Sequence, residues 1–187
     1  MQKKVLSHDE IIEICQRLGK EITEVIKSEK KIPVFVGILK GSVNFMMDLL
    51  KFVTLPIYTD YIQISSYEGV SSTGRVRLVK DLSYDCNNRI VFIIEDIIDT
   101  GTSMKYLLEH IKSHNPKKVY VVALFDKAYA RKNEVVVDFV GKKLEDDAFL
   151  VGYGLDYNEL LRNIPEVYAI EPGDVDLLND YLARDKM

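Results

Sequence analysis

One stretch of the chain decides the fold: Ile90-Val91-Phe92-Ile93-Ile94, followed directly by Glu95-Asp96-Ile97-Ile98-Asp99-Thr100-Gly101-Thr102-Ser103. Its first five residues are apolar and mostly β-branched, which predicts a strand covered on both faces, as in a parallel sheet. Small and hydroxylated residues then lead into a predicted helix from about Met104 to Ser113, which ends before Asn115-Pro116. A buried strand that continues through a polar turn into a helix is the beginning of a βαβ unit.

The same alternation of strand and helix continues on both sides of this stretch. Ser7 and Glu10 have the spacing of a capping box, and apolar residues then recur at helical spacing. The pattern predicts helices over residues 8–29 and 43–52, and strands over residues 33–38, 56–65, 118–125 and 135–140. A polar segment with two glycines, residues 66–75, is expected to be a mobile surface loop. We therefore predict an α/β fold: a Rossmann-like, mainly parallel sheet flanked by helices, in a single domain over residues 1–187.

Composition and charge narrow the class of protein. The 187 residues are 47% hydrophobic and 29% charged, as in a globular domain. The net charge of −4 lacks the positive potential that phosphate backbones attract, so no nucleic acid partner is expected. The start carries no apolar targeting segment and no run approaches the roughly 18 residues of a membrane span, which predicts a cytoplasmic protein without a membrane partner. Cys15 and Cys86 lack Cys-x-x-Cys spacing, and Cys15 falls on an apolar helix face, so we expect it to be buried and reduced.

The turn after the decisive strand has the residues of a phosphate site. In open parallel sheets, ligands bind at the carboxyl ends of the strands. Residues 99–103 leave backbone N–H groups free at a helix N-terminus, and the helix dipole adds positive potential there. Glu95 and Asp96 suit sugar hydroxyls or a hard divalent cation such as Mg²⁺. The alternative, that Asp99 or Thr100 merely caps the helix, does not account for a carboxylate pair beside it.

Two familiar phosphate-binding motifs are absent from the sequence. No stretch supplies the Gly-x-x-x-x-Gly-Lys-[Ser/Thr] of a Walker loop. Gly152-x-Gly154 is followed by Tyr157 where a dinucleotide fingerprint requires its third glycine. Neither a P-loop enzyme nor a dehydrogenase is favoured.

The residues from Val91 to Ser103 resemble the phosphoribosyl-pyrophosphate signature of type I phosphoribosyltransferases: a hydrophobic strand, two acids, two apolar residues, then Asp-Thr-Gly. Further segments are similar to the hypoxanthine-guanine phosphoribosyltransferase family within it. They are its pyrophosphate loop (Leu39-Lys40-Gly41-Ser42), the start of its flexible catalytic loop (Ser65-Ser66-Tyr67) and its hood motif (Val151 to Glu159, ending in Arg162). The chain departs from the pattern at Ser42, where glycine or alanine is more usual, and at Thr102, which occupies a variable position.

This resemblance implies a reaction and an architecture. The reaction is the Mg²⁺-dependent transfer of ribose 5-phosphate from phosphoribosyl pyrophosphate to N9 of a 6-oxopurine. Hypoxanthine or guanine would give IMP or GMP, with release of pyrophosphate, in purine salvage. The architecture is a core of about residues 30–145 under a small hood from about residues 146–187, with a contribution from the N-terminus. A homodimer or homotetramer is expected.

The resemblance also implies the role of each site residue. Asp99 would be the catalytic general acid/base that faces N7 of the purine, and Ser66 and Tyr67 would lie in the flexible loop. The phosphoribosyl group would be bound by Glu95, Asp96, Asp99, Thr100, Gly101, Thr102 and Ser103. Pyrophosphate would be bound by Lys40, Gly41 and Arg162, with assistance from Arg131 and a cis peptide between Leu39 and Lys40. The purine would be bound by Lys127 at O6, by Phe149 through stacking, by the backbone of Leu150 and by Asp156; Mg²⁺ would be held near Glu95, Asp96 and Asp156.

Alternatives remain beside this interpretation. His110 and His114 have the spacing of helical metal ligands, but favourable charge at a helix C-terminus is the simpler interpretation. A sensor that binds phosphoribosyl pyrophosphate and nucleic acid would require a basic face or a further domain. An enzyme for uracil, orotate or adenine is disfavoured by Lys127 and the hood motif, whereas xanthine remains open.

Overall fold

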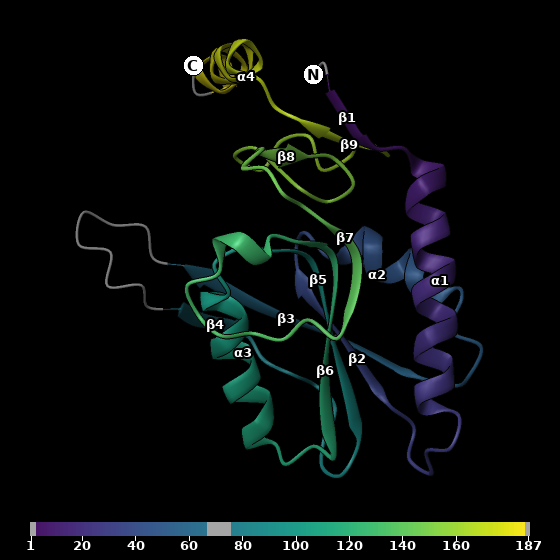
Figure 1. The fold of residues 1–187 in the computed structure, drawn as a ribbon. Coiled ribbons are helices and arrows are strands. Elements are labelled where there is room, and N and C mark those ends of the chain that lie inside the picture. Colours follow the sequence, from purple (N-terminus) through teal and green to yellow (C-terminus); the bar gives the residue numbers. More distant parts are fainter. Residues whose placement is uncertain (1–2, 67–75, 186–187) are drawn as a thin grey trace.

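The computed structural model describes residues 3–66 and 76–185, and it contains two sheets (Figure 1). The larger sheet has six strands in the order β4-β3-β2-β5-β6-β7. These are β2 (Val34–Leu39), β3 (Tyr58–Ser66), β4 (Val76–Lys80), β5 (Ile90–Ile98), β6 (Lys118–Asp126) and β7 (Phe139–Lys143). All neighbours pair in parallel except β4, which runs antiparallel to β3 at the edge. The predicted α/β fold with a mainly parallel sheet is confirmed.

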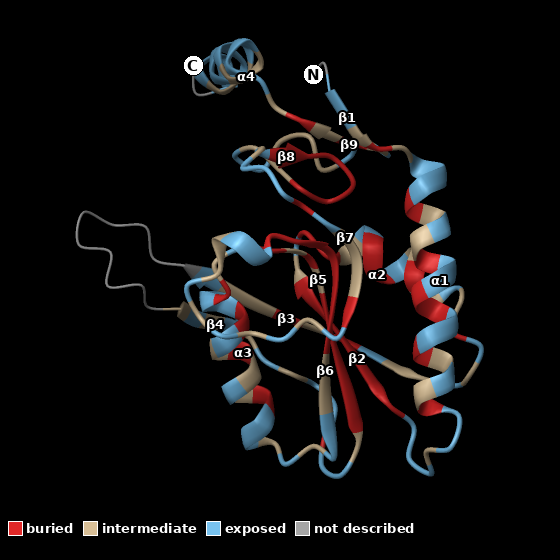
Figure 2. Ribbon diagram, in the orientation of Figure 1, coloured by how far each residue is buried: buried red, intermediate tan, exposed pale blue. Residues whose placement is uncertain are grey.

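Helices cover both faces of this sheet. Helices α1 (His8–Ile26) and α2 (Val43–Leu50) cover one face, and α3 (Thr102–Ser113) covers the other (Figure 1). Along β5, Phe92 and Ile94 pack toward α1 and α2, whereas Val91 and Ile93 pack toward α3. The central strands are therefore buried on both faces (Figure 2), as their continuous apolar sequence predicts.

Helix α1 begins at the predicted capping box. The backbone N–H of Ser7 donates to Glu10 Oε2 at 2.7 Å, and the N–H of Glu10 donates to Ser7 Oγ at 3.3 Å. Cys15 lies on the buried face of this helix, and both it and Cys86 are free thiols. The expectation that Cys15 is buried and reduced is confirmed.

A second, antiparallel sheet joins the two ends of the chain. Strand β1 (Lys3–Leu6) pairs with β9 (Val167–Ala169), which also pairs with β8 (Leu150–Val151). We call this sheet, together with residues 152–166, the hood; it lies over the carboxyl ends of the core strands (Figure 1). Tyr153 anchors it to the core, because its hydroxyl donates to Asp48 Oδ2 on α2 at 2.6 Å. Helix α4 (Pro172–Asp185) follows β9 and contains no buried residue.

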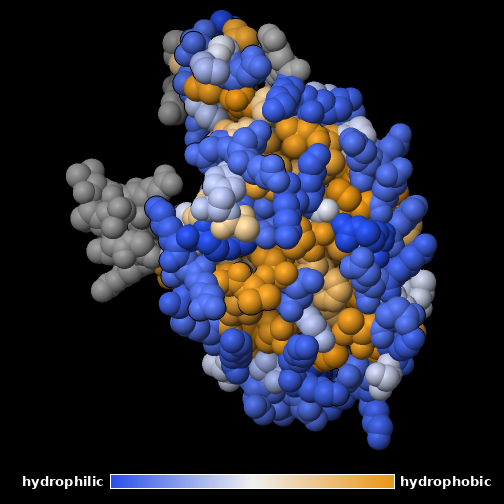
Figure 3. Space-filling model, viewed as in Figure 1, coloured by the Kyte–Doolittle hydropathy of each residue, from blue (hydrophilic) through white to orange (hydrophobic). Residues whose placement is uncertain are grey.

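Several boundaries differ from the sequence expectations. Strand β5 extends to Ile98, so Glu95 and Asp96 are strand residues and not part of the following turn. The strand predicted over 135–140 is instead β7 at Phe139–Lys143, because pairing with β6 begins only where Phe139 lies opposite Val122. Val136, in the apolar run before it, is 70% exposed. On the face of the molecule seen in Figure 1, hydrophobic side chains gather in the middle, between α3 and α1 (Figure 3).

Two further outcomes concern the segments around the core. Ser66 is the last residue of β3, and the rest of the predicted mobile loop, including Tyr67, lies outside the described residues. No helix within residues 3–66 and 76–185 is long and apolar enough to cross a membrane.

Candidate functional site

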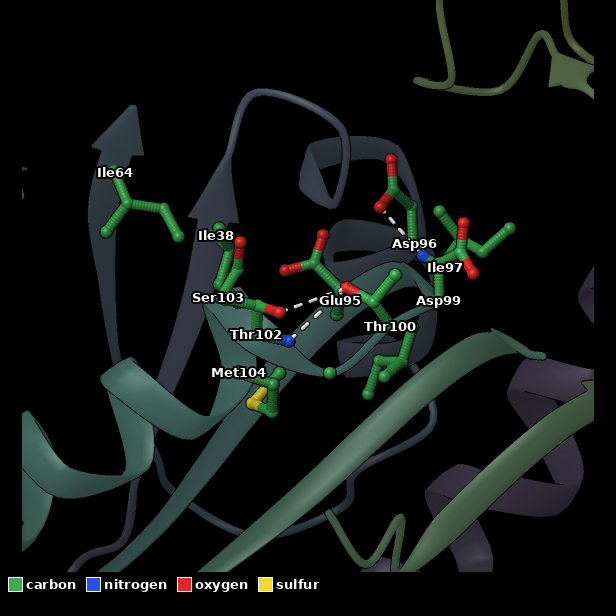
Figure 4. A pocket seen from close by; sticks show the side chains of 12 residues that line it. Ile38, Ile64, Glu95, Asp96, Ile97, Asp99, Thr100, Thr102, Ser103 and Met104 are labelled. Atoms are coloured by element: carbon green, nitrogen blue, oxygen red, sulfur yellow. Dashed lines mark hydrogen bonds between the residues drawn. The ribbon is translucent and has the colours of Figure 1, made fainter. Parts of the chain in front are cut away.

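A pocket of about 280 Å³ lies at the carboxyl end of β5, where the sequence predicts a ligand (Figure 4). Ile38 from β2 and Ile64 from β3 form one side of it, and the rest of its lining is the continuous run from Glu95 to Met104. Strand β5, the turn after it and the start of α3 thus contribute side by side to one cavity. The pocket brings together every residue predicted to bind the phosphoribosyl group.

The two adjacent carboxylates of β5 have different surroundings. Successive strand residues face opposite sides, and Figure 4 shows the carboxylates of Glu95 and Asp96 pointing in different directions. Burial, reinforced by the negative charge of Asp96, raises the pKa of Glu95 well above its usual value. Asp96 is itself buried and lies against Gly41, where a Cβ atom would overlap its Oδ2. Glycine at position 41 therefore allows the loop after β2 to approach Asp96.

The turn from Asp99 to Ser103 leaves the N-terminus of α3 open to a ligand. The N-cap residue is Gly101, which adopts φ 79° and has no side chain to cap the helix. Thr100 Oγ1 lies 3.3 Å from Thr102 Oγ1, and Asn133 Nδ2 donates to the latter at 2.9 Å. The alternative in which Asp99 or Thr100 caps the helix is met in part, because Thr100 Oγ1 accepts the backbone N–H of Thr102 at 3.5 Å, a long hydrogen bond that engages one N-terminal amide. Free amides and hydroxyls at a helix N-terminus suit a phosphate group.

Arg131 braces the base of this turn. Its guanidinium donates to the carbonyl of Ile98 at 2.9 Å, to the carbonyl of Asp99 and to the carboxylate of buried Asp126. The sequence resemblance assigned Arg131 an assisting role at pyrophosphate. The structure places it instead between the ends of β5 and β6, where it fixes the backbone that carries Asp99.

The loop after β2 meets the hood through two glycines. The peptide bond between Leu39 and Lys40 is cis, as expected from the resemblance. Ser42 fills the position where the family more often has glycine or alanine, and its hydroxyl donates to the carbonyl of Ile38 at 2.7 Å. Gly154 of the hood adopts φ +104°, and a Cβ there would overlap the carbonyl oxygen of Gly41. The core and the hood thus touch through backbone at this point.

Lys40 and Arg162, two predicted pyrophosphate ligands, share one carboxylate. Lys40 Nζ lies 2.8 Å from Glu159 Oε2, and Arg162 contacts the same oxygen at 3.3 Å. The hydrogen bond from Lys40 is the main cause that lowers the pKa of Glu159. Arg162 also pairs with Asp156 Oδ1 at 2.7 Å and donates to the carbonyl of Gly154 at 2.6 Å. Sequence reasoning assigned Glu159 no role of its own, because a carboxylate in a turn carries no local signal of its distant partner.

The predicted purine-binding residues lie where β6 ends and β8 begins. Lys127 directly follows β6 and is buried, with 6% of its surface exposed. Its Nζ donates to the carbonyl of Ala148 at 3.0 Å, which leaves further N–H donors of the ammonium for a ligand. Phe149 is 54% exposed and meets Tyr157 edge to face, whereas Leu150 is buried in β8. Lys127 thus reaches the residue that precedes Phe149, and a buried ammonium and an exposed ring on adjoining segments suit a planar base with a carbonyl group.

Of the three residues predicted to hold Mg²⁺, Asp156 does not line the pocket that Glu95 and Asp96 line. Within residues 3–66 and 76–185, the one group of three acidic, histidine or cysteine side chains close enough to share a metal ion lies elsewhere. Asp156 is instead engaged by Arg162 and by the backbone N–H of Glu159 at 2.8 Å.

The family model for the phosphoribosyl transferase domain matches residues 1–158. Hypoxanthine-guanine phosphoribosyltransferase of Staphylococcus aureus is 41% identical over 173 residues, covering 92% of this chain and 95% of that protein. The enzyme of the same name from Staphylococcus epidermidis is 43% identical over 172 residues, covering 91% and 94%.

Solved structures that are similar to this chain carry the same kind of enzyme name. A crystal structure of a hypoxanthine phosphoribosyltransferase from Staphylococcus aureus superposes with a TM-score of 0.87 at 40% identity, covering 93% of this chain and 94% of that one. A hypoxanthine-guanine phosphoribosyltransferase from Bacillus anthracis superposes with a TM-score of 0.85 at 31% identity, covering 91% and 99%.

Proposed function

The chain belongs to the phosphoribosyl transferase domain family, and from this premise we propose that it transfers ribose 5-phosphate from phosphoribosyl pyrophosphate to N9 of hypoxanthine or guanine. The products are IMP or GMP and pyrophosphate, so the enzyme acts in purine salvage. One observation carries this proposal: a single pocket combines the open N-terminus of α3 with the half-buried carboxylate of Glu95. That combination suits a sugar that bears both a phosphate and hydroxyl groups.

Each part of the pocket has a task in this reaction. The amides and hydroxyls of residues 99–103 bind the 5-phosphate, and Glu95 and Asp96 bind the ribose hydroxyls. Displacement at an anomeric carbon develops positive charge on the sugar, and nearby carboxylates stabilise that charge. Asp99 holds or accepts the proton at N7 of the purine as a general acid/base. Arg131 supports this step indirectly, because it fixes the backbone on which Asp99 is carried.

The departing pyrophosphate carries a large negative charge that the protein must balance. Lys40 and Arg162 supply two cations at the junction of core and hood, and Gly41, next to Lys40 in the chain, lies against Asp96. Both cations now pair with the carboxylate of Glu159, which takes the place of a negatively charged ligand. We expect pyrophosphate to replace that carboxylate when the substrate binds.

The carboxylates near the pocket fit Mg²⁺. Glu95, Asp96 and Asp156 offer oxygen atoms alone, which hard divalent cations prefer, and half-buried Glu95 lies beside a second acid without a basic partner among its main interactions. Mg²⁺ commonly uses one or two carboxylates together with substrate phosphates, so three preassembled protein ligands are not required. When bound, the ion supplies positive charge that stabilises the leaving group.

Base recognition is assigned to the end of β6 and the hood. Lys127 donates to the purine O6, Phe149 stacks on the ring, the backbone of Leu150 reads its edge, and Asp156 completes the site. We further propose that residues 1–187 act as one unit, a core of about 30–145 under a hood that includes about 146–187. Its expected setting is the cytoplasm and its expected assembly is a homodimer or homotetramer, without nucleic acid or membrane partners.

A spectrophotometric assay tests the proposal. The enzyme is mixed with phosphoribosyl pyrophosphate and, in separate reactions, with hypoxanthine, guanine, xanthine, adenine or uracil. Nucleotide formation from hypoxanthine or guanine that disappears when Mg²⁺ is removed supports the reaction as proposed. Activity with adenine or uracil alone overturns the assignment of the base. Binding of phosphoribosyl pyrophosphate without turnover of any base favours the sensor alternative.

A further inference from the structure

Three metal-ligating side chains meet outside the proposed active site. His110 and His114 lie one turn apart near the end of α3, and Asp81 directly follows β4. One ligand atom from each residue lies within 4.8 Å of the others. None of the three lines the pocket at the end of β5. The sequence spacing identified the two histidines, but only the fold brings Asp81 to them.

Neighbouring contacts hold the three side chains in place. His110 Nε2 lies 2.7 Å from Asp81 Oδ1, and the same oxygen accepts the backbone N–H of Leu82 at 2.7 Å. The rings of His110 and His114 meet edge to face, with centroids 5.1 Å apart. The ring of Tyr106 is nearly parallel to that of His110, with centroids 6.4 Å apart. Fixed rings lose little conformational freedom when they bind a ligand.

The composition of the cluster indicates its ligand. Imidazole nitrogen and carboxylate oxygen together suit first-row transition metals, and Zn²⁺ is commonly held by three such ligands with one position open. In a tetrahedral site with bonds of about 2.0–2.2 Å, ligand atoms lie about 3.3 Å apart. The three ligand atoms, which all lie within 4.8 Å of one another, are therefore already close to that spacing. The side chain of Asp81 is 46% exposed and that of His110 is 20% exposed, so an ion enters from solvent.

A hydrogen-bonded pair of His110 and Asp81 does not by itself account for the position of His114. His110 and Asp81 suffice for such a pair, and the helix C-terminus favours a positively charged histidine. Neither effect requires the ring of His114 to converge on the same point. We propose that Asp81, His110 and His114 form a binding site for a divalent transition metal ion, with Zn²⁺ as its representative. The ion would link the edge strand β4 to α3, the helix that begins at the phosphate-binding turn.

Zinc binding to untagged protein tests this site directly. Calorimetric titration is carried out in excess Mg²⁺, which occupies the carboxylates of the active site, and His110→Ala, His114→Ala and Asp81→Asn are compared with the wild type. We expect one Zn²⁺ per wild-type chain and binding at least roughly tenfold weaker in each variant. His8→Ala removes the third histidine of the chain, on α1, and serves as the matched control with unchanged binding. Equal binding by all variants overturns the proposal.

Two measurements on the wild type remain decisive if a variant folds poorly. Because the chain has three histidines, addition of Zn²⁺ should shift the ring NMR signals of His110 and His114 and leave those of His8 in place. Co²⁺ bound at the cluster should show a tetrahedral absorption spectrum without a thiolate charge-transfer band. Such a band would assign the ion to a cysteine such as buried Cys86 and overturn the site. None of these readouts depends on the transferase reaction.

Discussion

Lys40 Nζ lies 2.8 Å from Glu159 Oε2, a contact between residues that are 119 positions apart in the sequence. It connects the loop after β2 to the hood, directly beside the close approach of Gly41 and Gly154. Arg162 contacts the same carboxylate, so one anion of the protein holds both cations assigned to pyrophosphate. The side chains of Lys40 and Glu159 are each more than half exposed, and a pair in that setting is weak enough to be exchanged for a stronger anion.

Glu159→Gln should therefore strengthen binding of phosphoribosyl pyrophosphate. The variant removes the internal competitor and leaves Lys40 and Arg162 in place. Exposed ion pairs are weak, so we expect a decrease of about twofold to fivefold in the KM for phosphoribosyl pyrophosphate and in the inhibition constant of pyrophosphate. Steady-state kinetics measures both. Lys40→Ala is the matched control and should raise both constants; a higher KM in Glu159→Gln would show that the carboxylate supports substrate binding.

Gly41→Ala should damage catalysis far more than stability. The new Cβ would overlap Asp96 Oδ2, which displaces either the carboxylate or the loop that carries Lys40. A misplacement of about 1 Å in a positioned site can cost roughly 10²-fold in rate, and we expect a fall of that order in kcat/KM. Gly173→Ala is the matched control, since nothing lies within 4 Å of a Cβ at that position of α4. Equal activity of the two variants would contradict the proposed role of the Gly41–Asp96 contact.

Much of the fold follows from local sequence pattern. Ile90 to Ile94 form a strand because a continuous apolar run must be buried on both faces, and Ser7 with Glu10 starts α1 because both capping bonds are local. The hood strands carry no such signal. Strand β8 has two residues, and it is defined by the pairing of Leu150 with Ala169, 19 positions away. A pairing of that kind depends on where the core places the two segments.

The candidate site also has one part that the local sequence predicts and another that depends on the fold. The pocket lining from Glu95 to Met104 is continuous in sequence, so its chemistry could be predicted from the order of the residues alone. The partners of Arg131 could not, because a lone arginine after a strand does not indicate which carbonyl groups it will reach. Asp81 is a similar case: it lies 29 positions before His110 and joins it through the packing of β4 beside α3.

Asp99→Asn should abolish most of the turnover and leave the fold intact. The side chain of Asp99 is exposed at the edge of the pocket, so its loss removes little packing. Removal of a general acid/base typically costs ~10²–10⁴-fold in kcat, and we expect a loss in that range with a similar KM for phosphoribosyl pyrophosphate. Thermal unfolding of the two proteins should coincide. Near-full turnover in the variant would assign the proton transfer to another group.

The acid stability of the protein should depend on Asp60. This carboxylate is 6% exposed and accepts backbone N–H groups from Ser83 at 2.6 Å, from Tyr61 at 2.8 Å and from Tyr84 at 3.1 Å. Burial alone would raise the pKa of Asp60, but these donors, together with Lys80, outweigh it and hold the pKa below its ordinary value of 3.8. The folded protein therefore binds this proton more weakly than the unfolded chain does. The stabilising contribution is present above about pH 4 and is lost as the pH falls through the lower, folded-state pKa.

Asp60→Asn tests this linkage by urea unfolding at a series of pH values. Asparagine offers one acceptor oxygen and turns an amide toward the remaining donors, so we expect the free energy of unfolding at neutral pH to fall by about 1–3 kcal/mol. The difference from the wild type should begin to shrink as the pH falls below 3.8 and should be smallest below the folded-state pKa, where the protonated wild-type side chain resembles the variant. Asp85→Asn, which alters an exposed carboxylate of the same loop, is the control and should cost less. A difference that stays constant down to acid pH would mean that Asp60 acts through shape and not through its charge.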